Sequence, residues 1–139
     1  MFKRIIVALD GSDNSKRALT VALRIGECFG STIYLVHAYR RVSDLHGYNE
    51  YEGLVAKREG AGQAVLDESR HLLGETTLEV YDELLEEPAA EAIISVAKAR
   101  KADLIVMGTR GRSTLTGMLF GSTSNKVAQH AACPVMLTR

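Results

Sequence analysis

Short apolar runs alternate with helix-forming segments along the whole chain, and this alternation constrains the fold more than any other feature. Residues 5–9 (IIVAL) and 104–107 (LIVM) are apolar at successive positions, which is typical of strands buried on both faces of a parallel sheet. The pattern predicts strands at residues 5–9, 32–39, 76–85, 103–107 and 134–138, and helices at 15–29, 51–73, 88–101 and 122–131. We therefore expect a single α/β domain over residues 1–139, with a five-stranded parallel sheet covered by helices on both faces.

Local signals set the expected ends of these elements. Gly30 and Gly74 follow the first two helical patterns, as C-terminal glycines do, and Pro88 should occupy the first turn of the third helix. The strand at 76–85 carries several carboxylates, which favours an edge position. Residues 40–50 are polar and irregular, and a connection of this length often forms a binding loop.

Charge and cysteine usage exclude several classes of function. Lys plus Arg and Asp plus Glu number 17 each, so a broad electrostatic grip on nucleic acid or anionic lipid is not expected. No apolar stretch is long enough to span a bilayer, and the N-terminus does not resemble a signal peptide. Cys28 and Cys133 form no metal or disulfide pattern. We expect both to be buried free thiols, in a cytoplasmic protein.

One glycine-rich segment carries most of the chemical information. It runs from Met107 and Gly108 to Gly121 and Ser122, between a buried strand and a helix start. Ligands of open α/β sheets bind at the carboxyl ends of strands, and free N–H groups at a helix start attract anions. Ser122 can cap the helix or contact a phosphate. The residues alone leave an ordinary turn and a phosphate loop equally open, since the spacing fits neither the P-loop nor the dinucleotide fingerprint.

The same segment resembles a known family. Gly108, Gly111, Gly121 and Ser122 reproduce the Gly-x2-Gly-x9-Gly-Ser motif of ATP-binding universal stress proteins. The likeness extends over the whole chain and includes the opening residues 5–12 (IIVALDGS). The resemblance implies a sheet with strand order 3-2-1-4-5, a bound adenine nucleotide, and a homodimer formed through the last strands.

The resemblance also implies roles for individual residues. Backbone near Ala8, Leu9 and Ala38 would hold the adenine, and Asp10 would face the ribose or a Mg²⁺ or Mn²⁺ ion carried by the nucleotide. Gly108, Gly111, Gly121 and Ser122 would contact the phosphates, and Met107, Thr123 and Ser124 belong to the same expected nucleotide site. The hydroxyls of Thr123 and Ser124 would contact phosphate or simply fit the first helical turn.

Several of these residues have a plainer interpretation. Asp10 would serve equally as a helix cap, although its place after the first strand favours a ligand role. Arg110 and Arg112 are either solvated loop residues or countercharges for phosphate. His37 lies in an apolar strand and is expected to be a hydrogen-bonded core histidine. No nucleophile–base pair or paired-carboxylate site is evident.

Three functions remain open at this point. The first is a nucleotide-dependent regulatory protein of the stress response, with slow or no ATP hydrolysis. The second is an enzyme such as an ATPase, an autophosphorylating protein or an adenylyl transferase. The third is a module that binds a protein partner through residues 40–50 or the last strand, with a vestigial pocket.

Overall fold

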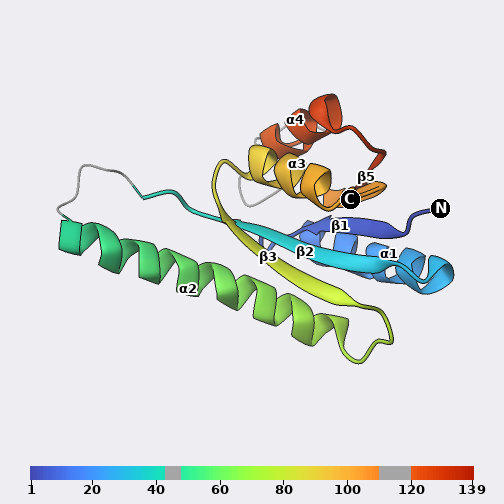
Figure 1. Cartoon of the computed structure of the whole chain (residues 1–139), viewed down its shortest axis with the longest axis horizontal. Helices are drawn as coiled ribbons and strands as arrows, with labels where there is room; N and C mark the ends of the chain where they lie inside the picture. Colours follow the sequence, from blue (N-terminus) through green and yellow to red (C-terminus); the bar gives the residue numbers. More distant parts are fainter. Residues whose placement is uncertain (43–47, 110–119) are drawn as a thin grey trace.

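The computed structural model describes residues 1–42, 48–109 and 120–139, in which strands and helices alternate. The strands are β1 (Arg4–Ala8), β2 (Thr32–Tyr39), β3 (Val80–Glu86), β4 (Leu104–Gly108) and β5 (Val135–Thr138). The helices are α1 (Asp13–Phe29), α2 (Tyr48–Leu73), α3 (Ala89–Ala99) and α4 (Ser122–His130). Figure 1 shows α2 running the full length of the sheet and beyond its end.

The strands form one parallel sheet in the order β3-β2-β1-β4-β5. β1 is central, pairing with β2 on one side and with β4 on the other. The order confirms the expected topology and places β3 at an edge, where its carboxylates meet water. Because the strands on the two sides of β1 are reached by crossovers in opposite directions, the carboxyl end of β1 is a topological switch point.

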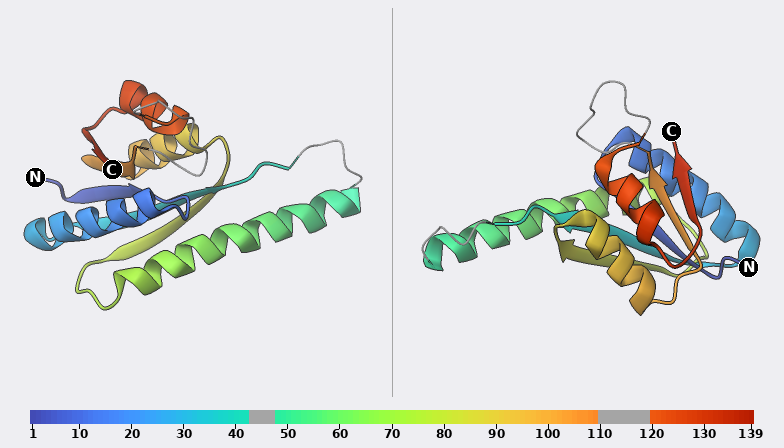
Figure 2. Two further views of the ribbon diagram at one scale, coloured as in Figure 1. Left: turned by 180° about the vertical axis from the view of Figure 1, so that it is seen from behind. Right: turned by 90° about the horizontal axis from the view of Figure 1, so that it is seen from above.

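Two apolar cores lie on opposite faces of the sheet, and Figure 2 shows from two further directions the helices that cover these faces. One packs α1 and α2 against β1 and β2 around Ile5, Ile33 and Leu66, all fully buried. The other packs α3 and α4 against the sheet around Ile105 and Val127, which are also fully buried. Successive strand residues point to alternate faces of the sheet, so each continuous apolar run contributes side chains to both cores.

Most element ends differ from the expectations by one or two residues, and larger differences occur at the starts of α2 and β3. α2 begins at Tyr48 instead of residue 51, and β3 begins at Val80 instead of residue 76. Pro88 is the N-cap of α3 and precedes its first turn. Gly30, by contrast, ends α1 in a left-handed conformation with φ of 64°, as the sequence predicts.

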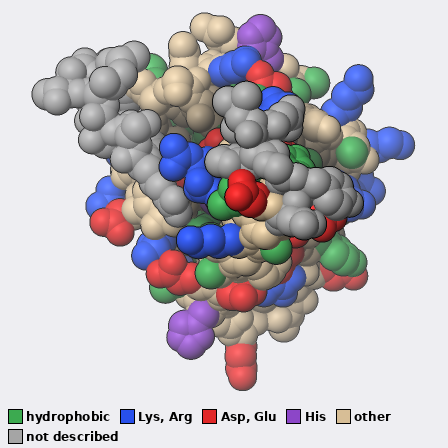
Figure 3. All heavy atoms as spheres, turned by 90° about the vertical axis from the view of Figure 1, so that its left-hand side faces the viewer, with side chains coloured by type: hydrophobic (Ala, Val, Ile, Leu, Met, Phe, Trp, Pro, Cys, Tyr) green, Lys and Arg blue, Asp and Glu red, His purple; other side chains and the backbone are tan. Residues whose placement is uncertain are grey.

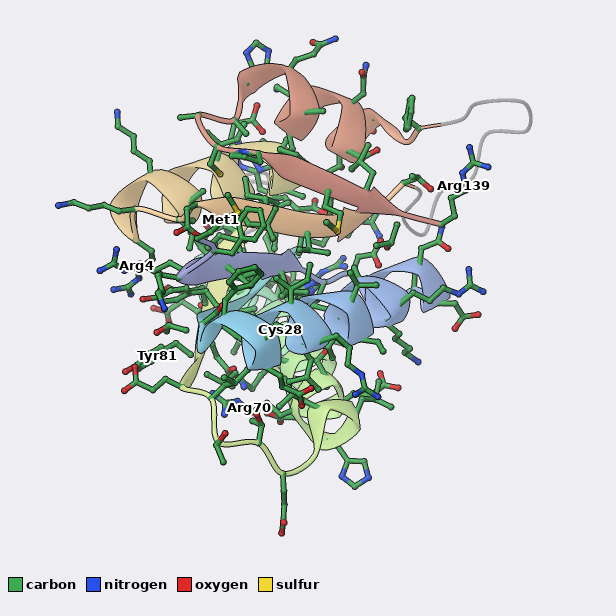
Figure 4. All side chains as sticks on the ribbon, turned by 90° about the vertical axis from the view of Figure 1, so that its right-hand side faces the viewer. Met1, Arg4, Cys28, Arg70, Tyr81 and Arg139 are labelled. Atoms are coloured by element: carbon green, nitrogen blue, oxygen red, sulfur yellow. The ribbon has the colours of Figure 1, made fainter. Side chains whose placement is uncertain are left out.

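The two cysteines do not share one environment. Both are free thiols, but Cys28 is exposed and Cys133 is half-buried, so the expectation of two buried thiols is wrong. Cys28 lies on the solvent side of α1, whose buried face carries Leu19, Ala22 and Gly26. Figure 4 shows Cys28 with Arg4 and Tyr81 at the end of the molecule where the strands begin.

Candidate functional site

A cavity of about 460 Å³ opens at the carboxyl ends of the central strands. Its wall is formed by the exits of β1, β2 and β4, the start of α4, and one side of α2. The volume lies in the range of small-molecule sites. At this end of the molecule Lys and Arg side chains gather beside Asp and Glu side chains (Figure 3).

Most of the residues expected at a nucleotide site line this cavity. They are Ala8, Leu9, Asp10, Ala38, Met107, Gly108, Gly121, Ser122, Thr123 and Ser124. Arg110, Gly111 and Arg112 lie outside the described residues. The structure thus brings together residues from three strand ends and one helix start that lie far apart in the sequence.

Asp10 occupies the half-buried rim of the cavity next to the start of α1. Its Oδ1 accepts a hydrogen bond of 2.9 Å from the Ser12 N–H. The cap of α1 is Ser12, whose hydroxyl oxygen accepts from the Ser15 N–H at 3.2 Å. Asp10 therefore shapes the turn that precedes the helix and is not its cap, and it stays beside the cavity.

The start of α4 is fixed by a small set of hydrogen bonds around Thr109. The Thr109 carbonyl accepts from the Gly121 N–H at 2.5 Å and from the Ser124 hydroxyl at 2.9 Å. The Thr109 N–H donates to the Thr138 carbonyl of β5 at 2.8 Å. Gly121 is the N-cap, so Ser122 does not cap α4.

The two serines of α4 have different environments. Ser122 is the first helical residue and its side chain is exposed at the cavity. Ser124 is 3% exposed and its hydroxyl bonds to backbone carbonyls. Ser122 is thus placed to contact a ligand, whereas the hydroxyl of Ser124 holds the helix start against β4.

One wall of the cavity was missed by reasoning from the sequence. Arg58, Gly62 and Val65 on α2, together with Arg40 after β2, line the cavity from the β2 side. A Cβ atom on Gly62 would lie 2.8 Å from Leu84 Cδ1 and 3.3 Å from His37 Cδ2. Gly62 therefore allows α2 to approach the sheet closely. The sequence does offer one signal for this wall, because a glycine inside a helical pattern often marks a position where the helix packs closely against a neighbour.

His37 and Tyr39 belong to the same wall. His37 is 8% exposed, and its Nδ1 lies 2.6 Å from the Leu9 carbonyl oxygen, so the expected hydrogen-bonded core histidine is confirmed. Tyr39 also lines the cavity. Burial, and then the negative charges of Glu59 and Glu86, raise the pKa of its phenol, so Tyr39 remains a neutral hydrogen-bond donor at physiological pH.

No group of three or more His, Cys, Asp or Glu side chains suited to hold a metal ion occurs within residues 1–42, 48–109 and 120–139. The carboxylate-bearing residues that line the cavity are Asp10, after β1, and Glu87, after β3. One or two carboxylates suit a Mg²⁺ ion that is bound mainly through nucleotide phosphates and water. The donor set fits a metal carried by a ligand better than a resident metal.

Comparison with known proteins identifies the relatives of this chain. The model of the universal stress protein family matches residues 1–139. The chain belongs to the universal stress protein family. A universal stress protein of Thermus aquaticus, encoded in the 3′ region of a QAH/OAS sulfhydrylase gene, is 41% identical, and the match covers 100% of both chains. The universal stress protein MJ0531 of Methanocaldococcus jannaschii is 32% identical over 100% of this chain and 83% of its own.

Solved universal stress protein structures share the fold. UspA from Lactobacillus plantarum superposes with a TM-score of 0.86 at 22% identity, over 99% of this chain and 98% of its own. A universal stress protein in complex with cAMP gives a TM-score of 0.74 at 26% identity, over 99% and 97% of the two chains. One from Archaeoglobus fulgidus in complex with dAMP gives 0.60 at 20% identity, over 100% and 98%.

Among the described residues, no helix has the length and apolar character that a membrane crossing requires. α2 is the longest helix, with 26 residues, and both charged and glycine residues occur along it.

Proposed function

We propose that this universal stress protein binds an adenine nucleotide, preferentially ATP with Mg²⁺ or Mn²⁺, and acts as a nucleotide-dependent regulator in the stress response. The observation that carries the proposal is the position of Gly121 and Ser122. These last two residues of the glycine motif form the start of α4 and line the same cavity as Asp10 and Ala38. The N–H groups of a helix start favour phosphate.

The solved relatives support an adenine nucleotide as the ligand. The relative at 26% identity was solved with cAMP, which contains the adenine, ribose and phosphate that this cavity would accommodate. In the proposed arrangement phosphates lie at Gly121–Thr123, and the adenine lies between the ends of β1 and β2. The residues Arg110, Gly111 and Arg112 are proposed as further phosphate contacts on the strength of the motif alone.

Slow or absent hydrolysis is part of the proposal. The Asp10 Oδ1 accepts a hydrogen bond from the Ser12 N–H. This carboxylate is therefore better suited to hold the turn and to contact a metal ion than to act as a general base. Turnover measured with and without Asp10→Ala would distinguish binding from enzymatic nucleotide chemistry. An ATPase rate that is lost in Asp10→Ala would contradict the binding role.

Calorimetry with ATP and Mg²⁺ tests the proposal directly, and no heat of binding at millimolar nucleotide would contradict it. Ser122→Asp is the sharpest variant, because an acidic residue suits a helix start and should preserve the fold while repelling phosphate. We expect it to weaken ATP binding at least about tenfold and adenosine binding little. Ser95→Asp, at an exposed position of α3, is the matched control and should bind ATP normally.

We further propose a homodimer formed through β5, acting in the cytoplasm. β5 is an edge strand and Met136 on it is 37% exposed, which leaves polar backbone and an apolar side chain for a partner strand. The formal net charge of zero provides little repulsion between copies. Both cysteines are free thiols, consistent with a reducing compartment.

A further inference from the structure

The base end of the proposed nucleotide should lie next to α2. α4 packs near β5 and α3, whereas α2 packs against β2 and β3 on the other face and the other side of β1. β2 and β4 are separated by two strand spacings, or about 10 Å. A nucleotide whose phosphates lie at the start of α4 therefore extends across the sheet end and places its base at the ends of β1 and β2, on the side where α2 lines the cavity. The inference rests on the proposed function for the position of the phosphates.

His37 offers a hydrogen-bond acceptor to this end of the cavity. A carbonyl oxygen can only accept, so the bond to Leu9 requires a proton on Nδ1 of His37, and Nε2 of the neutral ring is then an acceptor. Within the described residues, His37 makes its hydrogen bond through Nδ1, and its Nε2 atom bonds to no other described residue. Every side-chain nitrogen or oxygen that is fully buried among these residues does have a hydrogen-bond partner. Nε2 is consequently accessible to solvent, and the space beside it is the cavity that His37 lines.

Arg58 offers hydrogen-bond donors to the same end of the cavity as His37. It lies four residues before Gly62, so both residues lie on one face of α2, and Gly62 faces His37. α2 begins at the end of the molecule where β2 ends (Figure 1), which places Arg58 one turn, about 5.4 Å, further outward than Gly62. The His37 acceptor and the Arg58 donors therefore belong to one wall of the cavity.

Arg58 lacks a partner within the part of the chain that the structure describes. Its side chain is half-buried, and it joins none of the ion pairs between described residues. A partly buried guanidinium loses part of its hydration, and without a hydrogen-bond acceptor this loss of free energy is not compensated. A ligand that brings acceptor atoms to this wall would provide that compensation.

We propose that His37 and Arg58 recognise the base of the bound nucleotide. Adenine carries an exocyclic amine that donates and ring nitrogens that accept, which complements the His37 Nε2 acceptor and the Arg58 donors. The planar guanidinium also suits the face or edge of a purine. In hypoxanthine a carbonyl oxygen replaces the amine, and this oxygen faces the His37 acceptor without a hydrogen bond. The wall thus selects adenine over hypoxanthine.

Calorimetry with ATP, AMP and adenosine tests the Arg58 contact. Arg58→Met should weaken all three ligands by one similar factor, about tenfold, because the lost contact is to the part that they share. Lys57→Met removes the same charge from the adjacent position, which lies outside the cavity wall, and should change binding less than about twofold. An effect that grows with the number of phosphates, or equal effects of the two variants, would overturn the assignment of Arg58.

Comparison of ATP with ITP tests His37. The wild type should prefer ATP at least about tenfold, since a site that hydrogen-bonds an N–H group rejects an analogue without it. His37→Asn retains a donor near Nδ1 and removes Nε2, so the preference should fall toward unity, while His37→Gln, with an amide near Nε2, should keep part of it. Equal binding of ATP and ITP by the wild type would overturn the role of His37. If the wild type bound no nucleotide at all, the proposed function itself would fail, which is a distinct result.

Discussion

Gly108 and Asn14 are in such close contact that a Cβ atom on Gly108 would lie 2.7 Å from the Cβ of Asn14 and 3.1 Å from its carbonyl carbon. The first glycine of the motif therefore allows the start of α1 to pack on the end of β4. This requirement exists whether or not a phosphate approaches Gly108, so one residue of the motif has a role in the fold itself.

Gly108→Ala should destabilise the protein by about 1–3 kcal/mol, because the added methyl group meets backbone that cannot rotate away. Gly60→Ala is the control. A Cβ atom on Gly60, within α2, would meet nothing within 4 Å, so this change should stabilise the protein by about 0.5–1 kcal/mol through helix propensity. Urea unfolding would measure both. A neutral effect of Gly108→Ala would show that α1 can shift without cost.

Ser124→Ala should lower the free energy of unfolding by about 1 kcal/mol, since the hydroxyl bond to the Thr109 carbonyl is lost, and should weaken ATP binding through displacement of the start of α4. Thr123→Ala provides the comparison at the adjacent position, where the side chain is half-exposed, and should leave the free energy of unfolding within about 0.5 kcal/mol of the wild type. If both variants unfolded like the wild type, the bonds around Thr109 would not determine the position of α4.

Cys28 should react with a thiol reagent well before Cys133. Burial, and then the charge of Asp103, raise the pKa of the Cys133 thiol, so at pH 8 a smaller fraction of it is the reactive thiolate. Cys28 is exposed. Absorbance measured during DTNB labelling should show one fast and one slow thiol, and the rate of the slow thiol should continue to rise with pH above 9. Cys28→Ser should remove the fast phase; loss of the slow phase instead would contradict the assignment.

Met136→Asp should convert the proposed dimer to a monomer, because it places a charge in the apolar part of a β5–β5 contact. Sedimentation or native mass spectrometry would measure the subunit number. Tyr81→Asp is the control on the opposite edge, where Tyr81 of β3 is 49% exposed, and it should leave the subunit number unchanged. A monomeric wild type, or a dimer that only Tyr81→Asp disrupts, would exclude pairing through β5.

Local pattern predicted the elements because each depends on residues close in sequence. The β2 strand and the end of α1 at Gly30 agree with the expectations, since alternation of apolar runs and a C-terminal glycine are local signals. The exposure of Cys28 was also within reach, because Cys28 lies six positions after Ala22 and so falls off the buried face of α1. The strand order required the family resemblance.

The wall formed by α2 was beyond local reasoning. Gly62 appears in the sequence only as a weak point of a helix, and its packing against His37 depends on how α2 lies over β2. In the sequence Arg58 is indistinguishable from an ordinary surface cation, and only the fold shows that it lines the cavity. Residues of the strand ends and the glycine motif were predictable because parallel strands bring their carboxyl ends to one edge, whereas a helix chooses its neighbours through tertiary packing.

The bond from the Gly121 N–H to the Thr109 carbonyl anchors the start of α4. It joins the two chain positions on either side of residues 110–120, so α4 is held by β4 directly and not by the length of the connecting chain. Closing a longer connection costs only about 0.6 kcal/mol for each doubling of its length. Residues inserted or deleted between these two anchors should therefore leave the start of α4, and with it the wall of the cavity that Ser122 lines, in place.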